Sequence, residues 1–185
     1  TPDVDGTTPT TASGLVFIPK DDTCAMPMLA YLHGTKLKKD ETFYYLRGEW
    51  SLGVLTAASG YVACLPDYLG LGAGPGIHPY QHARSQATAS VDILRSAKII
   101  CDERELQLND QLFLVGYSQG GHAVMGTHRM IQEELANEFT VTASAPGSGP
   151  YDMSGSQLDM VAAFEPYSVP GYLPYVIQSY QHVYG

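Results

Sequence analysis

Short, unbroken apolar runs recur along this chain and end at turn-forming residues. Runs in which apolar and polar residues do not alternate favour strands that are covered on both faces, as in a parallel sheet. They predict strands over residues 15–18, 28–32, 61–65 and 112–115, and a fifth strand over residues 139–144.

The segments between these runs show helical periodicity instead. A stripe of small or apolar residues, three or four positions apart, consists of Ala83, Ala87, Val91, Leu94, Ala97 and Cys101. A second stripe after the fourth strand consists of Val124, His128, Ile131 and Leu135. A shorter helix is predicted over residues 50–58, with Gly60 in the left-handed conformation that ends helices. Strands that alternate with helices predict an α/β fold with a doubly wound, mostly parallel sheet and helices on both faces.

The last part of the chain has a different character. Prolines and glycines cluster over residues 145–150, and the stretch from Tyr151 to Gly185 is rich in tyrosine. It has helical patterns but no further strand pattern. We therefore divide the chain into a sheet-forming part, residues 1–148, and the beginning of an insertion, residues 149–185.

Residues 115–122, VGYSQGGH, contain a G-x-S-x-G pattern centred on Ser118. This pattern places the serine on a sharp turn between a strand and a helix, where its hydroxyl is exposed. The context fits, because a predicted strand precedes the pattern and a helical stripe follows it. Gly116 and Gly120 lack the Cβ atoms that would collide in so sharp a turn. Ser118 is therefore the predicted catalytic nucleophile.

Hydrolysis of an ester passes through a tetrahedral oxyanion, which needs fixed N–H donors. We expect one donor to be the backbone N–H of Gln119, at the start of the helix. The second should be the backbone N–H of Thr35, in the loop after strand 28–32, at the edge where ligands gather in such sheets. The substrate-pocket candidates here are Tyr117 and His33, although a turn role without a catalytic part is favoured for the His33 side chain.

Residues 66–72, PDYLGLG, follow another predicted strand and so lie at the same edge of the sheet. Asp67 and Tyr68 are further substrate-pocket candidates, and Asp67 could equally be a buried carboxylate bound to backbone amides. The glycines nearby do not make a dinucleotide-binding motif, because Pro75 stands where the third glycine of G-x-G-x-x-G belongs. We expect no cofactor.

Together these motifs resemble the secretory lipase family of α/β-hydrolases. The resemblance covers about residues 14–180 and rests on HGT, PDYLGLG, HPY, a helix with Asp92 and Arg95, and GYSQGGH, in this order. It implies an α/β-hydrolase fold, carboxylic-ester hydrolysis by a Ser-Asp-His triad, and a helical cap over the site. It matches Ser118 to the nucleophile, Gln119 and Thr35 to the oxyanion donors, and residues 149–185 to the beginning of the cap.

The acid and the histidine of the triad should follow the serine along the chain in this fold. The residues after Ser118 provide one helix, one strand and the cap-like stretch, but not the later strands whose ends should carry both groups. We therefore expect this chain to be the N-terminal half of such an enzyme, truncated at the start of the cap. A second fragment of the same protein would then carry the acid and the histidine.

Substitutes within the chain remain open. Asp152 or Asp159 with His182 would keep the order of the triad, but no strand fixes them. His122 is four residues after Ser118, on the helix that leaves the turn, and has no evident orienting acid. His128 lies on an apolar stripe, which favours a core position.

Metal binding is not expected. His78 and His82 have a spacing that a metal site on a helix can use, but Pro79 between them favours a helix start, and no third ligand is evident.

The cysteines suggest one disulfide bond. In the sheet order of the hydrolases, the helix that ends at Cys101 crosses the strand that Cys24 precedes, so both residues should lie near the same edge of the sheet. This arrangement predicts a Cys24–Cys101 disulfide. Cys64, in the middle of a strand, is predicted to be a small buried apolar residue.

Composition limits the partners. The chain has 185 residues, of which 44% are hydrophobic, and a net charge of −9, which argues against nucleic-acid binding. No apolar run approaches the roughly 18 residues of a membrane-spanning helix. The polar start, rich in threonine and proline, resembles the stretch left after removal of a signal peptide. With the expected disulfide, it favours a secreted or periplasmic protein.

The sequence therefore predicts a serine hydrolase that cleaves a small-molecule or lipid carboxylic ester through an acyl-enzyme on Ser118. A serine peptidase of the same fold, and a catalytically inactive fragment that binds a ligand in the same cleft, remain alternatives.

Overall fold

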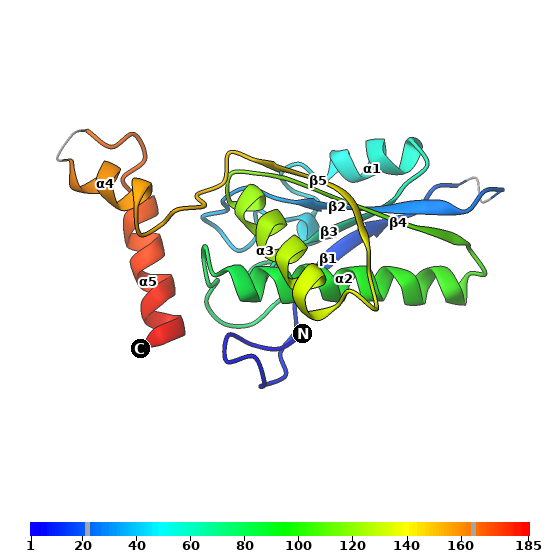
Figure 1. Ribbon diagram of the computed structural model, residues 1–185, viewed down its shortest axis with the longest axis horizontal. Helices are drawn as coiled ribbons and strands as arrows, with labels where there is room; N and C mark the ends of the chain where they lie inside the picture. Colours follow the sequence, from blue (N-terminus) through cyan, green and yellow to red (C-terminus); the bar gives the residue numbers. More distant parts are fainter. Residues whose placement is uncertain (21–22, 164–165) are drawn as a thin grey trace.

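The computed structural model describes residues 1–20, 23–163 and 166–185, and these form one mixed sheet with helices around it (Figure 1). The strands lie in the order β1-β3-β2-β4-β5. Their bounds are β1 Gly14–Phe17, β2 Met26–Leu32, β3 Val62–Pro66, β4 Leu108–Tyr117 and β5 Val141–Gly147. Strand β1 pairs antiparallel with β3 at one edge, and the other four strands run parallel. The predicted α/β fold is confirmed.

The helices cover both faces of the sheet. Their bounds are α1 Ser51–Ala58, α2 Ala83–Glu103, α3 Gln119–Glu134, α4 Ser156–Ala162 and α5 Tyr172–Tyr184, with a short 3₁₀ helix, η1, over Phe43–Tyr45. Figure 1 shows α1 on one side of the sheet and α2 and α3 on the other. Helices α4 and α5 stand beside the sheet.

The alternation of side chains along β2 explains why both faces are covered. Met26, Met28, Ala30 and Leu32 are buried in the larger core, under α2 and α3. Tyr31 points the opposite way, because successive strand residues face opposite sides, and packs with Phe43 and Leu65 in the smaller core. The predicted stripe of α2 is confirmed from Ala87 to Cys101, whereas Ala83 is exposed.

Two strands are longer than the apolar runs predicted. Strand β4 starts at Leu108 rather than at residue 112. The apolar pattern missed this first part, because residues 109–111 are polar and exposed. Strand β5, predicted over residues 139–144, spans Val141–Gly147 instead and pairs only with β4. Helix α1 ends as expected, with Gly60 in the left-handed region at φ 91°.

The predicted Cys24–Cys101 disulfide is wrong, because all three cysteines are free in the structure. Cys24 is exposed, whereas Cys101 points into the larger core with Cys64. The Cys101 thiol lies near enough to Cys64 to raise the pKa of that buried thiol further. The turn of α2 therefore directs Cys101 inward. The prediction of a secreted or periplasmic protein loses one of its two arguments.

The larger core should dominate the stability of the fold. Leu94 of α2 is fully buried, so Leu94→Ala should lower the free energy of unfolding by about 2–5 kcal/mol. Ile99 lies on the same helix with 58% of its surface exposed, so Ile99→Ala should change stability by less than about 0.5 kcal/mol. Urea denaturation of both variants measures the difference, and equal losses would contradict this assignment of the core.

Candidate functional site

Ser118 occupies a single-residue turn between β4 and α3. Its backbone has φ 59° and ψ −121°, a conformation that non-glycine residues rarely adopt and that clusters at functional sites. Its N–H donates to the carbonyl of Gly147 at the end of β5, at 2.8 Å. The sharp turn predicted from G-x-S-x-G is therefore present.

Close backbone packing makes this turn possible. A Cβ atom on Gly116 would lie 2.5 Å from the carbonyl oxygen of Gly120. A Cβ atom on Gly120 would collide with the carbonyl of Leu32 and lie 3.0 Å from that of His33. The first turn of α3 thus rests directly on the end of β2, and only glycine fits at the two contact points.

The loop after β2 lies against the turn at Ser118. A Cβ atom on Gly34 would be 3.8 Å from the Cβ atom of Ser118. Among the hydrogen bonds of the described residues, neither the N–H of Thr35 nor that of Gln119 donates to another protein atom. For Gln119 this is the ordinary state of the first turn of a helix. The two predicted oxyanion donors are therefore free to bind a ligand oxygen.

The side chain of Gln119 is fixed by a buried histidine. His78 Nδ1 donates to the carbonyl of Leu69 at 2.8 Å, which leaves Nε2 as an acceptor for the Gln119 amide at 2.6 Å. Burial lowers the pKa of His78 to about 3, so the ring stays neutral and keeps this arrangement. His78 holds Gln119 and thereby the start of α3.

Three of the predicted pocket residues form a buried support instead. His33, Asp67 and Tyr68 are fully buried. The nitrogens of His33 lie 2.7 Å from the carbonyl oxygen of Gly34 and 3.2 Å from that of Asp67, and burial lowers its pKa. The Tyr68 hydroxyl donates to the carbonyl of His33.

Asp67 matches its alternative role as a buried carboxylate. It accepts hydrogen bonds from the N–H groups of Phe43 and Tyr44 and from the hydroxyl of Ser13, at 2.8, 3.2 and 2.7 Å. This carboxylate therefore joins the residue before β1, the helix η1 and the loop after β3.

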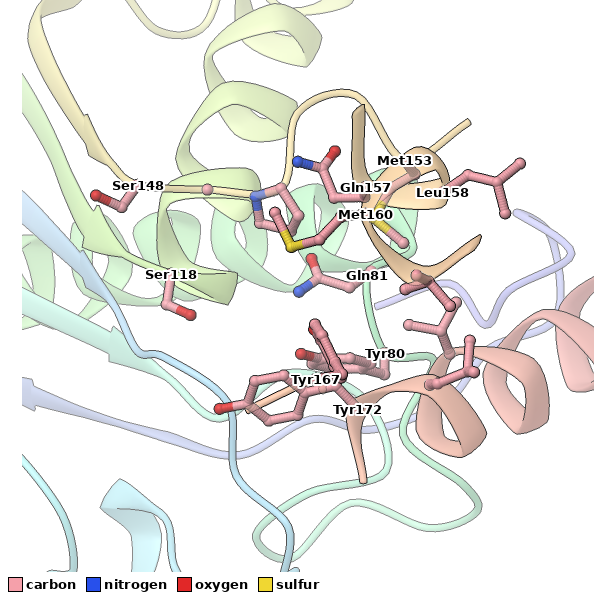
Figure 2. Close-up of a pocket in the computed structure, with 15 residues that line it drawn as sticks. Tyr80, Gln81, Ser118, Ser148, Met153, Gln157, Leu158, Met160, Tyr167 and Tyr172 are labelled. Carbon is pink, nitrogen blue, oxygen red and sulfur yellow. The ribbon is translucent and has the colours of Figure 1, made fainter. Parts of the chain in front are cut away.

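The cavity beside Ser118 has a volume of about 350 Å³ and lies between the end of the sheet and the helices α4 and α5 (Figure 2). Its lining comes from the loops at Tyr80 and Ser148 and from the C-terminal segment. The described residues that line it are Tyr80, Gln81, Ser118, Ser148, Gly149, Pro150, Met153, Gln157, Leu158, Met160, Val161, Tyr167, Tyr172, Leu173 and Val176. The predicted pocket residues His33, Asp67, Tyr68 and Tyr117 are not among them.

The role of these four residues in binding a substrate stays a prediction, and their positions in the fold explain why they do not line this cavity. The loop after β3 turns inward, which buries Asp67 against the N–H of Phe43 in η1 and Tyr68 in the larger core. Tyr117 is the last residue of β4 and is 63% exposed. The sequence reasoning missed Tyr80 and Gln81, for which the only signal was the HPY motif just before Gln81.

Helix α5 is attached to the loops of the site through tyrosines. The rings of Tyr80 and Tyr175 stack with centroids 4.3 Å apart. The Tyr80 hydroxyl is hydrogen-bonded to Thr35 Oγ1 at 2.9 Å, and Ser179 Oγ donates to the Tyr80 carbonyl at 2.8 Å. Tyr80 thus connects the loop of Thr35, the cavity wall and α5.

The histidines proposed as substitutes have other partners. His122 Nδ1 lies 2.8 Å from Gln86 Oε1, and burial lowers its pKa to about 4. His128 Nδ1 is 3.0 Å from the hydroxyl of Ser144, under β5. Within residues 1–20, 23–163 and 166–185, no histidine ring is hydrogen-bonded to a carboxylate side chain or to Ser118.

The carboxylates proposed as substitutes lie on exposed segments. Asp152 accepts hydrogen bonds from the N–H groups of Gly155 and Ser156, which lowers its pKa and caps the start of α4. Asp159, in α4, and His182, at the end of α5, are exposed. The described part of the chain thus gives no support to a triad of Ser118 with these residues.

The described residues contain no cluster of three or more metal-ligating side chains placed to hold an ion. None of the described helices is long and apolar enough to cross a membrane.

Solved structures share this fold. A "putative hydrolase" from Legionella pneumophila is 31% identical, with a TM-score of 0.87 over 98% of this chain and 49% of its own. The rice cell wall degrading esterase LipA from Xanthomonas oryzae is 35% identical, with a TM-score of 0.85 over 98% of this chain and 50% of its own. Candida antarctica lipase A is 15% identical, with a TM-score of 0.67 over 94% of this chain and 41% of its own, which shows likeness of fold alone.

No protein-family model and no curated protein matches the chain. It spans about half the length of the two bacterial proteins above. The chain therefore has the α/β fold that these hydrolase, esterase and lipase structures share.

The buried histidines predict acid sensitivity. An unfolded histidine titrates near pH 6.5, whereas the pKa values of His78 and His122 are about 3 and 4 in the folded chain. Below pH 6.5 the unfolded chain therefore binds protons that the folded chain excludes, and stability falls. Each histidine should lower the free energy of unfolding by about 2 kcal/mol between pH 7 and pH 5.

Urea denaturation at the two pH values measures this loss. In His78→Gln the loss should be smaller by about 2 kcal/mol, because one buried neutral histidine is gone. An unchanged dependence on pH in this variant would show that His78 is not buried in its neutral form.

Proposed function

We propose that this chain carries the nucleophile and the oxyanion donors of a serine hydrolase for carboxylic esters, of the secretory lipase type. The observation that carries the proposal is the position of Ser118, on a strained turn beside two unpaired backbone N–H groups and a largely apolar cavity. The likeness to an esterase at 35% identity supports an ester as the substrate.

The proposed chemistry assigns one task to each group. Ser118 Oγ forms a bond to the carbonyl carbon of the ester while a general base takes the hydroxyl proton. The carbonyl oxygen becomes an oxyanion, which accepts hydrogen bonds from the N–H groups of Thr35 and Gln119. The bond to the alcohol then breaks, the protonated base returns its proton to the alkoxide, and the acyl group stays on Ser118 until water releases it as an acid.

The general base is proposed to come from outside these residues. His122, the histidine nearest to Ser118 in sequence, has its Nδ1 2.8 Å from Gln86 Oε1, and it has no hydrogen bond to a carboxylate of the described residues. We propose that a histidine and an acid on a second segment of the same protein complete the triad, in agreement with the greater length of the two bacterial structures.

A fluorophosphonate probe tests the assignment of the nucleophile. Its phosphorus should form a bond to Ser118 Oγ with loss of fluoride, and intact mass measures the adduct. Ser118→Ala should abolish the adduct. Ser148→Ala should keep it, although Ser148 lines the same cavity. An adduct that survives Ser118→Ala would contradict the proposal, and a chain that never reacts would favour an inactive ligand-binding fragment.

Labelling in the presence of added imidazole tests whether the general base for Ser118 lies outside this chain. A positioned base contributes about 10²–10⁴-fold to such a step, so a small base that diffuses into the cavity should recover part of this factor. We expect labelling of Ser118 to become about tenfold faster in 100 mM imidazole. A rate that does not change with imidazole would mean that the chain already supplies its own base.

A further inference from the structure

Gln81 has a backbone conformation that is unusual for its residue type. Its φ is 58°, in the left-handed region that favours glycine, yet it carries a long side chain and is only 3% exposed. The residue stands between Tyr80 and the start of α2. The Tyr180 hydroxyl donates to the Gln81 carbonyl, so α5 helps to hold this conformation. Residues kept in such a conformation cluster at ligand-binding sites.

This conformation directs the Gln81 amide into the cavity. Figure 2 shows the amide between Met160 and Tyr80, directed toward the side of the cavity where Ser118 lies. The amide oxygen, Oε1, is buried and has no hydrogen-bond partner among the described residues. A buried acceptor without a partner is rare in folded proteins and calls for a ligand or a water molecule.

The side chains that line the cavity indicate the chemical class of such a ligand. Tyr80, Tyr167 and Tyr172 present aromatic rings, and Met153 and Met160 add polarizable thioethers that pack well against rings. The stack with Tyr175 fixes the ring of Tyr80. The described lining contains no acidic side chain. A flat apolar group with one neutral hydrogen-bond donor fits this wall.

We propose that Gln81 is a specificity-determining residue, whose Oε1 accepts a hydrogen bond from a hydroxyl group on an aromatic part of the substrate. The substrate class is then esters that carry a hydroxyaryl group. That the ligand is an ester rests on the proposed function, whereas the hydrogen bond to Gln81 does not. A site built to bond a hydroxyl discriminates against an analogue that lacks it, because the buried acceptor is then left unpaired.

The test measures binding without catalysis. The two ligands are 3-(4-hydroxyphenyl)propanamide and its 4-fluoro analogue, which is similar in size but cannot donate a hydrogen bond. The Ser118→Ala variant removes the nucleophile, and NMR titration gives both dissociation constants. We expect the hydroxyl ligand to bind about tenfold more tightly.

Substitutions assign the preference to one oxygen. In Gln81→Met, which keeps an unbranched side chain, the ratio of the two constants should fall to about one, whereas Gln81→Glu keeps an acceptor and should keep the preference. Gln157→Met is the matched control, because Gln157 lines the same cavity but its Oε1 already accepts from the N–H of Asp152. Its ratio should not change.

Two results would overturn the proposal. Equal affinities in the parent chain would mean that water satisfies Oε1, and this result needs no Gln81 variant to fold. A preference that survives Gln81→Met would place the acceptor elsewhere. Failure of the proposed function has a different signature, the absence of a probe adduct on Ser118, and it leaves these binding constants unaffected.

Discussion

The geometry of the site depends on the direct contact between the first turn of α3 and the end of β2. Gly120 lies against the carbonyls of Leu32 and His33 with no room for a Cβ atom, and Gly116 approaches Gly120 in the same way. Because the helix starts so close to the strand, the chain must reverse within one residue, and Ser118 takes the strained conformation. The loop after β2, which carries Thr35, lies against the same turn, since a Cβ atom on Gly34 would be 3.8 Å from the Cβ atom of Ser118. Backbone packing therefore sets the positions of both the hydroxyl and the two donors.

Buried polar groups then fix the loops around this contact. Asp67 joins the residue before β1, through the Ser13 hydroxyl, to the backbone N–H of Phe43 in η1, and neutral His78 holds the Gln119 side chain. Tyr80 links the loop after β2 to α5, because its hydroxyl is hydrogen-bonded to Thr35 Oγ1 and its ring stacks on that of Tyr175. A displacement of α5 would therefore act on both the cavity wall and the loop of a proposed oxyanion donor. These groups are buried, so an unmade bond in this network is costly.

The sequence predicted the parts of the molecule that local patterns determine. Apolar runs and helical stripes located the strands and helices, and G-x-S-x-G located the turn at Ser118, because glycines are needed at its contact points. The predictions that failed depend on how helices and loops pack against one another in the tertiary structure. The direction of Cys101 depends on the rotation of α2, and whether Asp67 lines a cavity or supports a loop depends on how η1 covers it. The HPY motif just before Gln81 did not reveal the role of this residue, because its positive φ depends on packing with α5, where Tyr180 lies 99 positions away in the sequence.

The central claim is that Ser118 faces an oxyanion site formed by Thr35 and Gln119. A crystal structure of the chain after reaction with a phosphonate probe tests it most directly, because the phosphoryl oxygen of the adduct stands in for the oxyanion. The claim predicts a phosphorus bonded to Ser118 Oγ, with its phosphoryl oxygen about 2.7–3.1 Å from the backbone nitrogens of both Thr35 and Gln119. A phosphoryl oxygen directed to solvent, or bound to other donors, would contradict it.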